Sequence, residues 1–78
     1  MARLPLCSSQ RIINALKRAG FEPASSSPGS HLTMEKHTPR RVITTIVVMG
    51  KTEVPRSTLK AILKLAELSQ KDFLKHLR

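Results

Sequence analysis

The chain has 78 residues and a single cysteine, and its 14 lysines and arginines against five acidic residues give a formal net charge of +9. This length allows one small domain, expected to span residues 1–78, and leaves little room for a large catalytic cleft; one cysteine excludes an intramolecular disulfide and a zinc cluster of cysteines. The charge predicts an anionic partner, either nucleic acid, acidic lipid or an acidic protein. Because no stretch has the apolar length of a signal peptide or a membrane span, we expect a cytoplasmic protein with no membrane partner.

The first predicted helix covers residues 10–19. Ser8 or Ser9 can cap it, because a serine oxygen accepts a hydrogen bond from an unpaired amide of the first turn. The apolar residues recur at helical spacing and form a stripe expected to be buried: Ile12, Ile13, Leu16 and Ala19. The residues left to solvent are Arg11, Asn14, Lys17 and Arg18. Gly20 is expected to end the helix, because glycine readily adopts the left-handed conformation found after helix ends.

Three strands are predicted next, over Phe21–Ala24, Ser30–Lys36 and Arg41–Met49. Residues 25–29 are rich in serine, proline and glycine, which is typical of a turn, and residues 37–40 form the second predicted turn. The third strand is rich in β-branched residues and almost continuously apolar. This composition predicts a central or well-covered position in the sheet.

Alternation in the second strand divides its side chains between two faces. Leu32 and Met34 share the face that is expected to point into the core. His31, Thr33 and Glu35 then share the other face. The pattern therefore predicts that His31 is displayed on the outer side of the sheet.

Two helices are predicted in the C-terminal part of the chain. Ser57 is expected to cap the first, while Ser69 and Asp72, which have the spacing of a capping box, start the second. Their apolar residues are Leu59, Ile62, Leu63 and Ala66 in the first, and Phe73, Leu74 and Leu77 in the second. The predicted order, α-β-β-β-α-α, is an α+β fold with a three-stranded antiparallel sheet and helices packed on one face.

His31 is the candidate catalytic residue. Cleavage of RNA without a metal requires a base for the 2′-hydroxyl, an acid for the leaving 5′-oxygen and cations that stabilise the phosphorane. An imidazole moves protons near neutral pH, and the missing side chain of nearby Gly29 lets a phosphate approach closely. A lone histidine on a strand is also commonly a surface or packing residue, so the residues alone leave both roles open.

The candidate phosphate ligands are Gly29, Ser30, Lys36, Arg40, Arg41, Lys17 and Arg18. Lys36, Arg40 and Arg41 surround the turn after the second strand, while the two residues of the first helix are weaker candidates. Ser30 can donate a hydrogen bond to a phosphate, although alternation points its side chain inward. The histidines and carboxylates show no metal-ligand spacing and no glycine-rich phosphate loop is present, so no metal or cofactor is expected.

Phe21 and Phe73 are the only aromatic residues of the chain. The sheet therefore offers no platform for stacked bases, which argues against recognition-motif, cold-shock and most single-strand-binding modules. A basic surface poor in aromatic residues instead suits contacts to the backbone and shape of RNA, as in double-stranded-RNA-binding domains.

The sequence resembles the HicA family of toxin–antitoxin mRNA interferases in several segments that match in order and spacing. They are Leu4-Pro5, Leu16-Lys-Arg-Ala-Gly-Phe21, Gly29-Ser30-His31, Ser57-Thr-Leu-Lys-Ala-Ile-Leu63 and Leu68-Ser-Gln-Lys-Asp-Phe-Leu74. The resemblance covers nearly the whole chain and implies a fold like that of double-stranded-RNA-binding domains. It also implies that the protein cleaves mRNA without a cofactor, that His31 is catalytic, and that a HicB antitoxin inhibits it by covering the active surface.

Two segments depart from the family pattern. Family members often end the third strand with Pro-x-His, where this chain has Val47-Val48-Met49. Met49 cannot replace a histidine in proton transfer. The family also commonly has basic residues or glutamine before the glycine, where this chain has Ser26-Ser27-Pro28, and this difference predicts weaker RNA contacts from that turn.

Three other functions fit parts of the sequence. The first is a non-catalytic RNA-binding module on the same fold, which only an activity measurement separates from an enzyme. The second is a helix-turn-helix over residues 57–78 that binds DNA through residues 70–78, although Phe73, Leu74 and Leu77 occupy much of that helix. The third is a small interaction protein whose charge meets an acidic partner, and an antitoxin would be such a partner.

Overall fold

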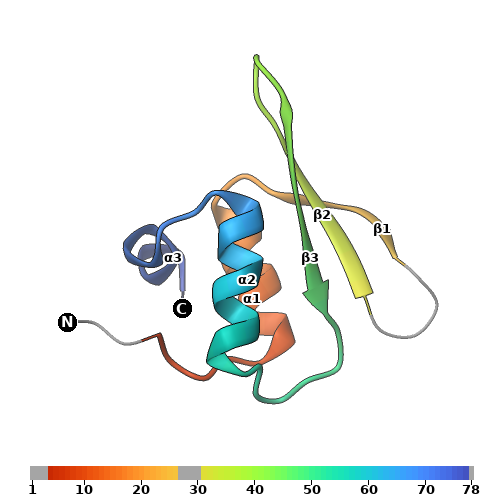
Figure 1. Cartoon of the computed structure of the whole chain (residues 1–78). Coiled ribbons are helices and arrows are strands. Elements are labelled where there is room, and N and C mark those ends of the chain that lie inside the picture. Colours follow the sequence, from red (N-terminus) through yellow and green to blue (C-terminus); the bar gives the residue numbers. More distant parts are fainter. Residues whose placement is uncertain (1–3, 27–30, 78) are drawn as a thin grey trace.

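The computed structural model describes residues 4–26 and 31–77 (Figure 1). Along the chain it contains α1 (Ser9–Arg18), β1 (Glu22–Ser26), β2 (His31–His37), β3 (Val42–Val48), α2 (Arg56–Ala66) and α3 (Gln70–His76). The three strands form one antiparallel sheet in the order β1-β2-β3. The predicted α+β fold and its α-β-β-β-α-α order are confirmed.

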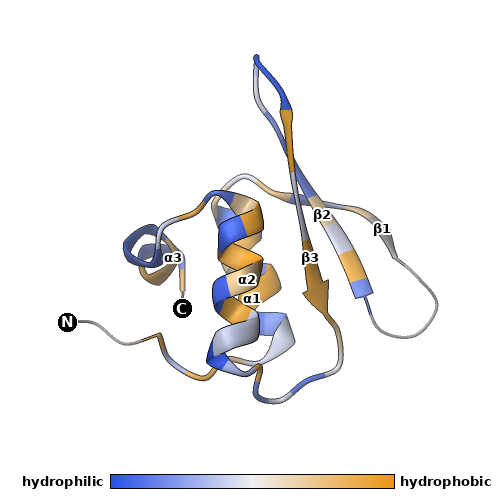
Figure 2. Ribbon diagram, viewed as in Figure 1, coloured by the Kyte–Doolittle hydropathy of each residue, from blue (hydrophilic) through white to orange (hydrophobic). Residues whose placement is uncertain are grey.

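β3 is an edge strand, so the prediction of a central or well-covered strand at this position is wrong. β2 occupies the centre, because each hairpin places the next strand beside the previous one. Thr45 and Val47 are buried, whereas Val42 and Ile46, which alternate with them, are 48% and 45% exposed. Both ends of β3 have the colour of hydrophobic residues in Figure 2. Because β-branched residues favour extended backbone whether one or both faces are covered, composition does not distinguish the two positions.

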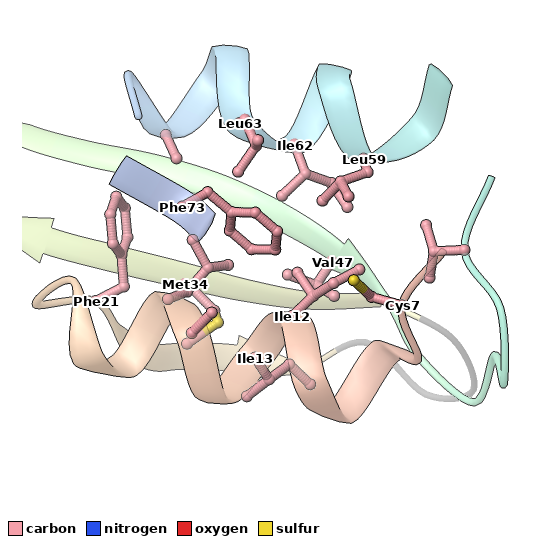
Figure 3. Packing of buried hydrophobic residues seen from close by; sticks show 14 of the residues in the cluster. Cys7, Ile12, Ile13, Phe21, Met34, Val47, Leu59, Ile62, Leu63 and Phe73 are labelled. Atoms are coloured by element: carbon pink, nitrogen blue, oxygen red, sulfur yellow. The ribbon is translucent and has the colours of Figure 1, made fainter. Parts of the chain in front are cut away.

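The core lies between one face of the sheet and the helices (Figure 3). Met34 of β2 and Val47 of β3 are fully buried there, and the ring of Phe73 from α3 lies between α1 and α2. The other buried apolar residues are Leu4, Cys7, Ile12, Ile13, Ala15, Leu16, Phe21, Val54, Leu59, Ile62, Leu63 and Ala66. The residues of the opposite sheet face are exposed or partly exposed, so that face remains uncovered within the described residues.

Both ends of α1 form as the sequence predicts. The hydroxyl of Ser8 accepts a hydrogen bond from the Arg11 amide at 3.2 Å. At the other end Gly20 has a φ of 102°, and two backbone hydrogen bonds complete the Schellman pattern. These run from the Gly20 amide to the Lys17 carbonyl (3.0 Å) and from the Phe21 amide to the Leu16 carbonyl (2.9 Å). The buried stripe differs at one position, because Ala15 is fully buried and Ala19 only half-buried.

Pro55, rather than Ser57, precedes and caps α2, so the predicted serine cap is wrong. The Pro55 carbonyl accepts a hydrogen bond from the Leu59 amide at 2.9 Å, and Ser57 lies exposed within the first turn. Proline suits a helix start, because its amide nitrogen has no hydrogen that would need a partner. The predicted start of α3 is confirmed, since the Ser69 hydroxyl accepts a hydrogen bond from the Asp72 amide at 3.1 Å.

Ser9 joins the start of α1 to the end of β3. Its buried hydroxyl donates to the Val48 carbonyl at 2.6 Å and accepts from the Lys51 amide at 3.0 Å. The Ser9 amide donates in turn to the Lys51 carbonyl at 2.9 Å. Together these hydrogen bonds hold residues 49–53 against the beginning of α1.

Replacing Ser9 with alanine removes both hydroxyl hydrogen bonds and leaves the Val48 carbonyl and the Lys51 amide without this partner. Because an unpaired buried polar group costs about 1–3 kcal/mol, we expect Ser9→Ala to lower the free energy of unfolding by about that amount in urea denaturation. Ser57→Ala is the matched control, and its effect on an exposed serine is expected to stay within about 0.5 kcal/mol. Equal losses in the two variants would contradict the role assigned to Ser9.

Candidate functional site

His31 begins β2 and lies on the outer face of the sheet, as the alternation predicts. It is exposed, whereas Leu32, the next residue, is partly buried and packs against the core. Its partner across the antiparallel pair is Val48, the last residue of β3. His31 is therefore accessible to a molecule that approaches the uncovered face of the sheet.

Several segments meet at the same end of the molecule as His31, and we call this region the His31 end. It consists of the start of β2, the end of β3, residues 49–53 and the starts of α1 and α2 (Figure 1). The Ser9 hydrogen bonds join α1 to β3 here. An isolated β-bridge between Cys7 and Val54 brings the segment before α2 to the same place.

The His31 end carries exposed basic residues that were not predicted as ligands: Arg11 at the start of α1, Lys51, and Arg56 and Lys60 in the first turns of α2. Lys51 follows Val48 by three residues, and both of its backbone polar groups are bonded to Ser9. The predicted turn over residues 37–40 would pair residue 31 with residue 46, whereas in the structure the turn covers residues 38–41 and residue 31 pairs with residue 48. Arg56 and Lys60 reach this end only through the orientation of α2, which the sequence pattern does not specify.

Lys36, Arg40 and Arg41, which were predicted as phosphate ligands, lie at the opposite end of the sheet. Lys36 follows His31 by five residues along an extended strand, which corresponds to about 17 Å at 3.3 Å per residue. Its side chain lies beside Gly20 in the turn after α1, and its Nζ lies 6.0 Å from the centre of the Phe21 ring. Arg41 forms an ion pair with Glu67, the residue that follows α2.

Lys17 and Arg18 also lie away from His31, in the last turn of α1. The Arg18 guanidinium donates a hydrogen bond to the His76 carbonyl at 2.9 Å. Gly29 and Ser30 fall outside the described residues. Of the predicted phosphate ligands that the structure describes, none lies at the His31 end.

A second exposed histidine stands on the same face of β2, at the far end of the strand. His37 Nε2 lies 3.3 Å from Glu35 Oε1, and Glu22 of β1 is the cross-strand neighbour of Glu35. Glu35 and His37 are four and six residues from His31, about 13 and 20 Å along the strand, so they make no direct contact with it. Within residues 4–26 and 31–77, no three histidines, cysteines or carboxylates are grouped to hold a metal ion.

α3 has only seven residues, and although Gln70, Lys71, Asp72 and Lys75 are exposed, its apolar side chains face the domain. Phe73 is fully buried, Leu74 is partly buried and Leu77 packs against the core. A recognition helix must instead present several side chains to the edges of bases. The packing of α3 therefore disfavours the helix-turn-helix interpretation.

The fold and the His31 end define a class of protein, a small basic α+β domain with helices on one sheet face and an exposed histidine on the other. Residues 9–68 of the 78 match the model of a protein family described as "HicA toxin of bacterial toxin-antitoxin". The chain belongs to the HicA toxin family, which gives it the role of a toxin and implies an antitoxin as its partner. The matched residues include β2 with His31 and end before α3.

No curated protein matches the sequence. The helices of the described part of the chain are all too short or too polar to cross a membrane.

Cys7, the single cysteine of the chain, is only 1% exposed. Loss of solvation on burial raises the pKa of its thiol, while the charge of Arg11 acts in the opposite direction. Because the thiolate is the reactive form, we expect a thiol reagent to label Cys7 at least about tenfold more slowly in the folded protein than in urea. Equal labelling rates would contradict the burial of this residue.

Proposed function

We propose that this HicA-family toxin is an endoribonuclease that cleaves mRNA in the cytoplasm, with His31 as general acid or base, and that a HicB-type antitoxin keeps it inactive. Membership of the family supports the toxin role. The observation that carries the proposal of RNA cleavage is the exposed position of His31 at the end of the sheet where Lys51 also lies. The proposed reaction uses neither a metal nor a cofactor.

In the proposed reaction the 2′-oxygen of a ribose attacks the adjacent phosphorus. A bond from O2′ to phosphorus forms and the bond from phosphorus to O5′ breaks, which gives a 2′,3′-cyclic phosphate and a 5′-hydroxyl. The 2′-hydroxyl loses one proton and the leaving O5′ gains one. His31 carries out one of these transfers and water the other, and a positioned side chain in such a role contributes about 10²–10⁴-fold to the rate.

Negative charge develops on the phosphorane oxygens, and a fixed cation beside them stabilises the transition state. Lys51 is the proposed cation, because its backbone is held by Ser9 and it follows Val48, the cross-strand partner of His31. Gly29 and Ser30 remain proposed contacts of the same phosphate. The proposed contacts of more distant nucleotides are Lys17, Arg18, Lys36, Arg40, Arg41 and Lys60.

His31→Ala is expected to reduce cleavage of a long mRNA by about 10²–10⁴-fold, because it removes the group that transfers the proton. The melting temperature and most of the RNA affinity are expected to remain. His37→Ala is the matched control, since His37 is an exposed histidine on the same strand and the same face. EDTA is expected to leave cleavage by the wild-type protein unchanged.

Three results would contradict this proposal in different ways. Cleavage by a correctly folded His31→Ala protein would remove His31 from the reaction. Inhibition by EDTA would contradict a metal-independent mechanism. RNA binding without cleavage by the wild-type protein would replace the enzyme with a non-catalytic RNA-binding module.

Lys51→Ala is expected to slow single-turnover cleavage by about tenfold or more, because it removes a cation from the transition state. It is also expected to lower the slope of log affinity against log salt by about 0.7, the value for one phosphate contact on a single strand. Lys36→Ala is the control at the opposite end of β2 and is expected to have the smaller effect on the cleavage rate. A larger loss of cleavage in Lys36→Ala would contradict the position of the reacting phosphate.

A further inference from the structure

The two edges of the sheet differ in how they are protected against pairing with another strand. Unpaired strand edges bind other strands, and proteins prevent this with proline, charged residues and irregular pairing. β1 has all three: Pro23 lacks an amide hydrogen, Glu22 carries a charge, and the pairing with β2 is irregular between Pro23 and Ser25. The β1 edge is therefore poorly suited to a further strand.

The β3 edge has none of these features. Val42–Val48 contains no proline and no charged residue, and it pairs with β2 in one unbroken register. Among the described residues, the backbone of Val42–Val47 forms hydrogen bonds with β2 and with no other element. The Val48 carbonyl, at the end of the strand, accepts a hydrogen bond from outside the sheet, donated by the Ser9 hydroxyl. The β3 edge is therefore regular, and among the described residues no backbone group outside the sheet pairs with Val42–Val47.

The side chains of β3 add an apolar surface to this edge. Val42 and Ile46 lie on the uncovered face and are 48% and 45% exposed, with Thr44 between them. No charged residue interrupts this row, although charged residues make up 24% of the chain. Exposed apolar residues that lie together on one face favour contact with a partner over contact with water.

The charges around β3 indicate the chemistry of its partner. Arg40 and Arg41 directly precede the strand, and Lys51 follows it by three residues. A segment that pairs with β3 is therefore expected to alternate apolar residues along its length and to carry carboxylates near its ends. A second copy of this chain fits poorly, because it would bring together two molecules that each carry a net charge of +9.

We propose that β3 binds an extended acidic segment of the antitoxin, which adds to the sheet as a fourth strand. The inference rests on the proposed function for the identity of the partner. Adjacent strands lie about 4.8 Å apart, so the added strand would lie about 10 Å from β2. Because Val48 is the partner of His31, one end of the segment reaches the His31 end, where its carboxylates pair with Lys51 in place of an RNA phosphate.

Ile46→Asp tests this surface, and Leu65→Asp is its matched control. Both replace an apolar side chain that is about half exposed, 45% for Ile46 on β3 and 54% for Leu65 on α2. The antitoxin encoded with this toxin is purified, and its affinity for each variant is measured by titration calorimetry. We expect Ile46→Asp to weaken binding by about 30-fold or more, as for a central interface residue, and Leu65→Asp to leave it nearly unchanged.

A second measurement does not depend on a substitution, so it tests the proposal even if Ile46→Asp disturbs the structure of β3. Hydrogen exchange of the wild-type toxin is compared with and without the antitoxin, and those backbone amides of residues 42–47 that do not bond to β2 are expected to become protected in the complex. Protection of β1 or of α2 without protection of β3 would overturn the proposal. Loss of binding in Leu65→Asp alone would also overturn it. So would a toxin dimer that Ile46→Asp dissociates, because a second copy would then occupy the edge.

RNA cleavage by the Ile46→Asp variant without antitoxin separates this inference from the proposed function. We expect the variant still to cleave RNA, because Ile46 lies two residues before the partner of His31 and donates no proton. If the wild-type protein cleaves no RNA, the proposed activity fails. The affinity and exchange measurements still show whether the antitoxin binds β3.

Discussion

Burial of one face of the sheet is the constraint on which both the candidate site and the proposed docking edge depend. Met34 and Val47 face the helices, and in the register of β2 with β3 this leaves His31 and Ile46 on the opposite face. A shift of either strand by one residue would exchange the two faces and expose the core. Burial of apolar surface stabilises the fold by about 25 cal/mol per Å². Because it fixes which face of β2 points to the helices, it also fixes the outward orientation of His31, which contributes little to the core.

The direction of the helices divides the basic residues between two ends of the domain. α1 and α2 both begin at the His31 end. At the opposite end of the domain, the side chain of Lys36 contacts the turn after α1, and Arg41 forms an ion pair with Glu67, which follows α2. Lys51 is the residue at which the two proposals meet, because it is both the proposed phosphate ligand and the proposed partner of antitoxin carboxylates. Binding of RNA and of antitoxin would then exclude each other at one end of the sheet, without any change in the fold.

The sequence predicted correctly the helix ends and side-chain orientations that depend only on neighbouring residues. The serine start of α1, its glycine end and the outward position of His31 each depend on a few adjacent residues, and all three are confirmed. The edge position of β3 depends on strand order, and the grouping of Lys51 with His31 depends on pairing across a hairpin. The roles of Gly29 and Ser30 stay predictions.

The most direct test of the account is to locate bound RNA on the toxin by NMR. An RNA with 2′-deoxy nucleotides cannot undergo the proposed attack, so it reports binding to the intact site. We expect the largest changes in chemical shift at His31, Val48 and Lys51. Changes concentrated at Lys36 and Arg41 instead would place RNA at the opposite end of the sheet and contradict the assignment of the site.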